Sequence, residues 1–215
     1  MSHVTESRLR EQMALHGQSL HQRGLVPGSS GNISLRFKGG ILVTPTNSCL
    51  GRLDPARIAL LDHNGKHLSG EPASKEAFLH LLMYQKRSTA KAVVHLHSTH
   101  AVAVSCCSGL DPHNAIPAMT PYYVMKIGLL PLVPYFMPGD QALAKAVAEV
   151  AATRHAVLLA NHGPVVAGKD LDNAVYAIEE LEESAKLFLL LRNTAVNALS
   201  VEQIAALNES FPIEN

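Results

Sequence analysis

Short hairpin patterns interrupted by helical segments restrict the possible folds of this chain more than any other feature. Residues 32–37 alternate apolar and polar side chains, and a pair of glycines turns this strand into a second one at 41–44. The nearly continuous apolar strand 156–161 also turns back, through 165–167. Because helices and strands do not alternate regularly as βαβ units, we expect an α/β fold in which helices cover a central, mostly antiparallel sheet.

The remaining periodic segments complete this arrangement. Apolar side chains recur at three- and four-residue steps in the expected helices, and Ser200 with Gln203 forms a capping box at the start of the last one. No linker or repeat separates the elements, so we predict one domain over residues 1–215. Helices are predicted at 5–23, 74–87, 140–154 and 171–191, after 97 and from 200 onward, and further strands at 58–61, 92–97 and 129–133.

The composition excludes several classes of protein. The 18 basic and 18 acidic residues balance to a net charge of zero, without the basic excess typical of nucleic-acid binding. No stretch approaches the ~20 apolar residues of a membrane span, and the polar N-terminus does not resemble a signal peptide. The 3 cysteines form neither a disulfide framework nor a CxxC metal pattern. We therefore expect a soluble, cytoplasmic protein that binds neither nucleic acid nor membrane.

Three of the 12 histidines occupy positions suited to metal binding. His95 and His97 lie two apart on a predicted strand, so they share one face with Cα atoms roughly 6.5 Å apart. They are interpreted either as zinc ligands or as polar residues on a solvated strand face, although the apolar flank favours burial, where unliganded imidazoles are costly. His162 follows another buried strand and is either a third ligand or a turn residue. His80 is interpreted either as a residue that supports the metal ligands from behind or as an ordinary residue on one face of its helix.

Other polar residues suit an acid–base and phosphate site. Glu76 stands in the first turn of the predicted helix 74–87, where it either complements the helix dipole or acts as a general acid/base. The loops 28–32 and 44–47, with Ser74-Lys75, offer backbone N–H groups, hydroxyls and a cation suited to phosphate. Each loop taken alone is more simply an ordinary turn.

These motifs occur in the order seen in the class II aldolase/adducin family, which the chain resembles from its first helix to about Leu191. Each motif is weak alone, but five in order at familiar spacing are specific. The resemblance implies the family's three-layer α/β/α sandwich and a homotetramer. The matching segments are Gly31-Asn32-Ile33-Ser34, Thr44-Pro45-Thr46, Ser74-Lys75-Glu76 with His80, His95-Leu96-His97 and Asn161-His162-Gly163.

The resemblance also implies roles for individual residues. The family binds a divalent metal, usually zinc, through three histidines that match His95, His97 and His162, and Mn²⁺ or Co²⁺ can substitute. The family's catalytic glutamate, which can also touch the metal, matches Glu76. A catalytic tyrosine matches Tyr122, with Tyr123 as the alternative. The phosphate pocket matches Gly31, Asn32, Thr46, Asn47, Ser74 and Lys75.

Two positions depart from the aldolases of the family. Asn47 stands where the aldolases have glycine, and Ser74-Lys75 replaces a serine pair. Lys75 either strengthens phosphate binding by its charge or meets a substrate carboxylate.

Within the family, residues 120–126 together with Ser74-Lys75-Glu76 look closer to the 3-oxo-tetronate 4-phosphate decarboxylases than to the related fuculose-phosphate aldolases. The resemblance implies a carbon–carbon lyase that converts a small phosphorylated sugar acid into dihydroxyacetone phosphate and carbon dioxide through an enediolate stabilised by the metal. A class II sugar-phosphate aldolase of the fuculose 1-phosphate type is the alternative. A non-enzymatic, adducin-like binding module is disfavoured because it has no need of Glu76 and three histidines together.

Overall fold

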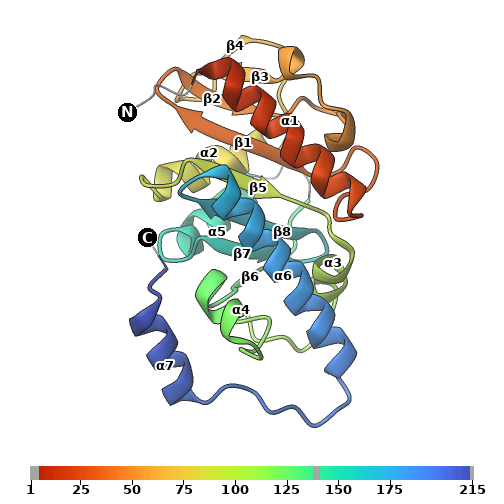
Figure 1. Cartoon of the computed structure of the whole chain (residues 1–215), viewed down its shortest axis with the longest axis vertical. Coiled ribbons are helices and arrows are strands. Elements are labelled where there is room, and N and C mark those ends of the chain that lie inside the picture. The colour runs from red at the N-terminus through yellow and green to blue at the C-terminus, as the bar shows by residue number, and fades with distance from the viewer. Residues whose placement is uncertain (1–4, 138–140, 214–215) are drawn as a thin grey trace.

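The central sheet joins strands that lie far apart in the sequence. The computed structural model describes residues 5–137 and 141–213. Its eight strands follow the order β4-β3-β2-β1-β5-β8-β7-β6, and every pair is antiparallel except β6 with β7 (Figure 1). The strands are β1 (Asn32–Phe37), β2 (Gly40–Val43), β3 (Ala59–Leu61), β4 (His67–Ser69), β5 (Ala92–His95), β6 (Leu132–Val133), β7 (Ala156–Leu159) and β8 (Gly163–Gly168).

Helices cover both faces of this sheet. Residues of α1 and α6 enter one buried cluster, while residues of α2 and α5 enter a second cluster on the opposite face. Figure 1 shows α1 and α6 crossing the near face. In the described ranges, no helix has both the length and the apolar character needed to cross a membrane. The helices are α1 (Glu6–Gln22), α2 (Ala77–Lys86), α3 (Thr99–Ser105), α4 (Pro121–Lys126), α5 (Gln141–Ala151), α6 (Leu171–Leu191) and α7 (Val201–Ser210), with short 3-10 turns at Leu50–Arg52 and Pro55–Arg57.

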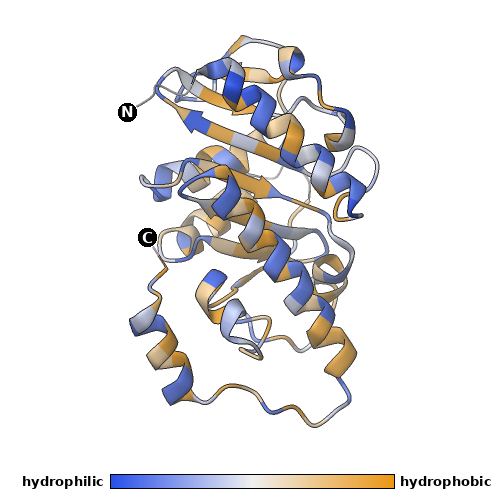
Figure 2. Cartoon of the chain, viewed as in Figure 1, coloured by the Kyte–Doolittle hydropathy of each residue, from blue (hydrophilic) through white to orange (hydrophobic). Residues whose placement is uncertain are grey.

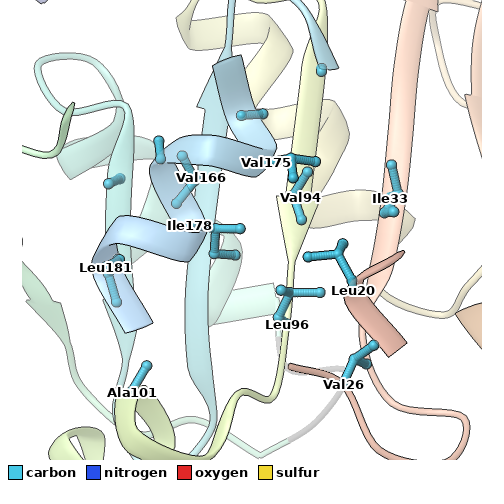
Figure 3. Close-up of a cluster of buried hydrophobic side chains, with 14 of the residues drawn as sticks. Leu20, Val26, Ile33, Val94, Leu96, Ala101, Val166, Val175, Ile178 and Leu181 are labelled. Carbon is cyan, nitrogen blue, oxygen red and sulfur yellow. The ribbon is translucent and has the colours of Figure 1, made fainter. Parts of the chain in front are cut away.

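Alternation along the central strands explains why two cores form. Val94 of β5 packs with Val175 and Ile178 of α6 (Figure 3), whereas the neighbouring Val93 belongs to the opposite cluster. Figure 2 shows β5 and β7 as mainly apolar strands in the middle of the molecule. Each fully buried aliphatic side chain contributes about 1.5–3 kcal/mol. The expected three-layer α/β/α sandwich with a mostly antiparallel sheet is confirmed.

The structure corrects several element boundaries. The strand predicted at 92–97 ends at His95, and the helix predicted from residue 74 begins at Ala77. Neither β4 nor α4 was predicted, because β4 has three exposed residues at the sheet edge and α4 has only six residues. In hindsight Thr120 marks the start of α4, since its Oγ1 accepts from the Tyr123 N–H at 3.1 Å. Residue 140, where a helix was expected to begin, lies outside the described residues.

Candidate active site

The site lies where the central strand β5 ends. Asn32 opens β1 and pairs with His95 in the antiparallel register, while Val165 of β8 pairs with His95 on the other side. His162 immediately precedes β8. His97 lies two residues beyond β5, so the shared strand face expected from its spacing is not what brings it close to His95.

Two glycines allow the backbone to close around this strand end. Gly31 has φ 72°, and a Cβ there would lie 2.9 Å from the His95 carbonyl oxygen. A Cβ on Gly163, which has φ 152°, would lie 2.5 Å from the Leu96 carbonyl oxygen. Any other residue would be strained at either position and would push the flanking turn away from β5.

Glu76, His95, His97 and His162 form one group, which we call the histidine–glutamate cluster. The Nε2 atom of His95 lies 3.1 Å from that of His97 and 3.3 Å from that of His162. Glu76 Oε1 lies 3.0 Å from His162 Nε2, and Glu76 Oε2 lies 3.5 Å from His95 Nε2. The four ligand atoms all lie within 4.8 Å of one another, so they can hold a single ion.

The ring orientation and charge state of the histidines fit a divalent metal. His95 Nδ1 lies 2.8 Å from the Pro164 carbonyl oxygen, so Nδ1 donates and the Nε2 lone pair faces the cluster. Burial lowers the pKa of His95 to about 3 and also lowers the pKa of His97, so both rings are neutral as metal ligands must be. Ligands at ~2.0–2.1 Å from a tetrahedral zinc lie roughly 3.3 Å apart, close to the spacing of these nitrogens.

Glu76 faces the histidines and does not cap its helix. Its carboxylate makes no capping hydrogen bond to α2 and instead accepts from Asn32 Nδ2 at 2.7 Å. Burial favours the protonated carboxyl, but the hydrogen bond with His162, the neighbouring imidazoles and the Asn32 amide outweigh burial and hold the pKa of Glu76 well below its usual range. The resting group is therefore a carboxylate.

The residues predicted to bind phosphate lie on three segments, 31–32, 46–47 and 74–75, and backbone hydrogen bonds join the last two. The Ser74 N–H donates to the Thr44 carbonyl oxygen at 3.0 Å, and the Thr46 N–H donates to that of Pro72 at 2.9 Å. A cavity of about 470 Å³ adjoins Thr46 and Asn47. Lys75 is exposed, whereas Asn32 is buried and its amide already contacts Glu76.

The Asn47 departure has a structural explanation. Asn47 has φ 55°, in the left-handed region that glycine adopts freely and that asparagine tolerates better than most residues. The loop can therefore keep its backbone path with asparagine in place of glycine.

The two candidate tyrosines have opposite surroundings on α4. The side chain of Tyr122 is 61% exposed, and among the described residues no hydrogen bond joins it to the cluster. Tyr123 is 1% exposed in the apolar core, and its hydroxyl has no partner in the described part of the chain. Burial raises the pKa of Tyr123. Of the two, only Tyr122 is accessible to a substrate.

The structure also supplies supporting residues that the sequence reasoning missed. The buried Glu182 carboxylate of α6 accepts from the N–H groups of His100 and Ala101, which anchors the start of α3 directly after His97. At the other end of α3, the His162 backbone N–H donates to Ser105 Oγ, with 3.3 Å between nitrogen and oxygen. The helix thus ties together the two turns that carry the candidate ligands His97 and His162. Nothing in the spacing of Glu182 from these residues could have revealed the contact.

The chain is also similar to known proteins over most of its length. Residues 11–189 match the family model of the class II aldolase and adducin N-terminal domain. A 3-oxo-tetronate 4-phosphate decarboxylase from Escherichia coli K12 is 49% identical over 203 residues, covering 94% of this chain and 96% of the relative. The L-fuculose phosphate aldolase of the same strain is 36% identical over 192 residues, covering 87% and 86% of the two chains.

A solved structure is similarly close. YgbL from Klebsiella pneumoniae, whose description names aldolase, epimerase and decarboxylase as candidate activities, matches with a TM-score of 0.93 at 45% identity. The match covers 95% of this chain and 99% of YgbL. From the family match and these relatives, the chain belongs to the class II aldolase and adducin family and is a lyase.

Proposed function

We propose that this chain is a metal-dependent decarboxylase that converts a 3-oxo-tetronate 4-phosphate into dihydroxyacetone phosphate and carbon dioxide. The observation that carries the proposal is the meeting of the Glu76 carboxylate with three histidine Nε2 atoms at the end of β5. The choice of reaction is supported by the relative at 49% identity, which is named for this activity.

His95, His97 and His162 would hold the metal, with Glu76 as a further ligand in the resting site. Zinc is proposed because catalytic zinc sites often have three histidine ligands and a fourth position that substrate can take, which Glu76 would fill at rest, and Mn²⁺ or Co²⁺ can substitute. When bound, the metal acts as a Lewis acid that stabilises negative charge on substrate oxygens.

The protein's other contribution is to place the substrate. Of the residues matched to the phosphate pocket, Asn32 already bonds Glu76 and His80 through its amide, so the phosphate would be held by Gly31, Thr46, Asn47, Ser74 and Lys75. This anchor directs the keto acid toward Glu76. The cation of Lys75 is exposed and free to meet a dianionic group.

Glu76 would move the proton that completes the reaction. The substrate is a β-keto acid, so the C1–C2 bond breaks, C1 leaves as carbon dioxide, and the electron pair forms an enediolate across C2 and C3. Glu76 then delivers a proton taken from solvent to C2, which gives dihydroxyacetone phosphate. Tyr122 either positions the departing carboxylate or assists this protonation.

The exposure of Tyr122 supports a role across a subunit interface in a homotetramer. A net charge of zero, which gives little self-repulsion, also favours assembly. Light scattering at micromolar concentration tests this part of the proposal. A species of about four chains is expected, and a clean 23.1 kDa species would contradict it.

Cleavage of a sugar phosphate is the second candidate function, favoured by the aldolase relative at 36% identity. An aldolase would use the same cluster and the same enediolate. Its leaving group would be an aldehyde instead of carbon dioxide. The two reactions thus differ on the side of the pocket that faces the leaving group.

One experiment separates the two reactions. The purified, metal-loaded protein is offered a 3-oxo-tetronate 4-phosphate and fuculose 1-phosphate in separate assays. Carbon dioxide, lactaldehyde and dihydroxyacetone phosphate are each followed, because both reactions release the last product. Carbon dioxide from the keto acid with little lactaldehyde is expected. Efficient release of lactaldehyde without carbon dioxide would replace the decarboxylase with the aldolase.

A further inference from the structure

Behind Glu76, four buried polar side chains form an unbroken series of hydrogen bonds, which we call the buried relay: Tyr84, Ser34, His80 and Asn32. The Tyr84 hydroxyl lies 2.8 Å from Ser34 Oγ, which lies 2.6 Å from His80 Nδ1. His80 Nε2 lies 2.5 Å from Asn32 Oδ1, and Asn32 Nδ2 lies 2.7 Å from Glu76 Oε2. None of the four is more than 3% exposed.

The contact with Glu76 sets the direction of every hydrogen bond in the relay. Asn32 must turn its N–H toward the carboxylate, because its carbonyl oxygen there would place two acceptors together. Asn32 Oδ1 therefore accepts from His80 Nε2–H, which leaves His80 Nδ1 as an acceptor for the Ser34 hydroxyl. The Tyr84 hydroxyl in turn donates to Ser34 Oγ. One arrangement of protons satisfies all four groups.

The state of His80 is consistent with this arrangement. The ring is completely buried, and burial lowers its pKa to about 4. A neutral ring carries one N–H, and the relay requires it on Nε2. A protonated ring would direct a second N–H at Ser34 and break the sequence of donors.

The relay joins the two elements that supply Glu76 and its partner. Asn32 and Ser34 lie two apart on β1, while Glu76, His80 and Tyr84 recur at four-residue steps into α2. Asn32 therefore bridges Glu76 and His80, and Ser34 bridges His80 and Tyr84, so two side chains of β1 bond three successive turns on one side of α2. A residue that only filled space here would not need a polar partner at each level.

We propose that His80 is a positioning residue, which acts through the Asn32 amide to hold the Glu76 carboxylate in the orientation that moves the proton at the reacting carbon. The inference rests on the proposed role of Glu76. In the described part of the chain, the His80 ring bonds Ser34 and Asn32 and none of the four cluster residues, so its loss should lower kcat more than it raises KM.

Two variants of His80 separate positioning from simple packing. A glutamine amide reaches as far as the histidine Nε2 and can donate to Asn32, whereas asparagine reaches only as far as Nδ1 and Ser34. His80→Gln and His80→Asn are both neutral, so they differ mainly in whether the Asn32 contact survives. For each, kcat, KM, bound metal and the thermal midpoint are measured on the metal-loaded protein.

His80→Asn is expected to lower kcat about 10-fold or more, the range typical of residues that orient an active-site ligand from behind. KM should change less than about 3-fold, bound metal should stay stoichiometric, and His80→Gln should restore most of kcat. Equal kcat in the two variants, or losses that follow the thermal midpoint, would overturn the proposal.

A second measurement does not depend on activity. The ¹⁵N chemical shifts of the His80 ring, assigned by their loss in His80→Gln, report which nitrogen carries the proton in the metal-free protein. The Nε2–H tautomer is expected, and the Nδ1–H tautomer would reverse the relay and refute the inference. If the wild-type protein cleaves fuculose 1-phosphate and not the keto acid, the proposed function is wrong. The His80 variants are then compared on the cleavage reaction, which also needs Glu76, so the inference about His80 is still tested.

Discussion

The surroundings of Glu76 differ on its two sides. Behind it, Asn32 and the rest of the buried relay are almost completely excluded from water, and each polar group has a partner. On the side of the predicted phosphate pocket, Lys75 and Asn47 are exposed, and Ser74 is half-buried.

This difference suggests that the buried side positions Glu76 and the open side captures the substrate. A group that moves a proton must be held within about 0.5 Å of its working position, and surroundings that exclude water and satisfy every hydrogen bond provide this. A surface that captures a charged substrate must instead remain open to solvent until the substrate arrives. Changes on the buried side should therefore affect kcat, and changes on the open side should affect KM.

The largest effect is expected from removing two of the proposed metal ligands, His95 and His97. The double substitution His95→Ala with His97→Ala should abolish stoichiometric metal binding after dialysis. Turnover should fall by about 10³-fold or more, because the metal is expected to supply several kcal/mol of charge stabilisation in the transition state. Metal content by mass spectrometry and the initial rate of carbon dioxide release check both statements.

A matched double variant controls for the loss of two histidines. His63 and His113 are exposed and lie outside the histidine–glutamate cluster. Their replacement by alanine should leave metal content and rate close to wild type. Full metal retention in the variant lacking both His95 and His97 would remove these residues from the site.

The next largest effect is expected at Glu76 itself. Glu76→Gln keeps the size of the side chain and can still accept from Asn32, but it cannot carry the proton. Turnover should fall by ~10²-fold or more, as expected for the loss of general acid/base catalysis. The measurement is kcat at saturating substrate, with the three histidines and the metal intact. A rate near that of wild type would exclude Glu76 from the proton transfer.

The segments that carry the proposed metal ligands could be predicted from the sequence because each has its own local signal. The apolar strands that end near His95 and His162 have clear patterns, and glycines mark the turns beside them. The prediction that His97 shares a strand face with His95 was wrong, because β5 ends at His95. The two rings meet through the turn that leads into α3, and two-residue periodicity cannot describe that turn.

The buried relay shows what local patterns omit. The spacing of Glu76, His80 and Tyr84 places them on one side of a helix, a signal present in the sequence. Their pairing with Asn32 and Ser34 depends on how α2 packs on β1, which is a tertiary contact across more than forty residues. Their burial, and with it the neutral state of His80, follows from that packing alone.

A third prediction tests whether water is excluded from the buried side, by measuring how the free energy of unfolding changes at acid pH. The pKa of His80 is about 4 in the folded protein, below its ordinary value of 6.5. The unfolded chain therefore binds more protons between these values, so the ring disfavours the folded state increasingly as pH falls from about 6.5 toward 4. His80→Gln should reduce this loss of stability in the metal-free protein by on the order of 3 kcal/mol.

Urea unfolding at several pH values measures the effect, and His155 offers a matched comparison. Burial also lowers the pKa of His155 to about 4, and its Nε2 donates to the Lys126 carbonyl oxygen at 2.9 Å. His155→Gln should protect against acid to a similar degree without altering kcat. An acid profile of His80→Gln that parallels wild type would mean that water reaches the His80 ring.

The smallest effect is expected at Lys75 on the open side. Lys75→Met removes the charge and keeps much of the length, and Lys75→Arg keeps the charge. If Lys75 binds the phosphate, Lys75→Met should raise KM about 10-fold with little change in kcat, since the phosphate is unchanged in the transition state. Lys75→Arg should stay within about 3-fold of wild type. The difference should shrink at high salt, because an exposed ion pair is screened.

The same variant decides between the two possible partners of Lys75. A contact with the substrate carboxylate would stabilise a charge that leaves as neutral carbon dioxide, so its removal would raise both KM and kcat. Dihydroxyacetone phosphate provides a direct comparison, because it keeps the phosphate but has no carboxylate. Inhibition by this product should weaken about as much as KM rises if Lys75 holds the phosphate. Unchanged product inhibition, together with a raised kcat, would instead place Lys75 beside the departing carboxylate and mark it as a residue that selects a keto acid over a sugar.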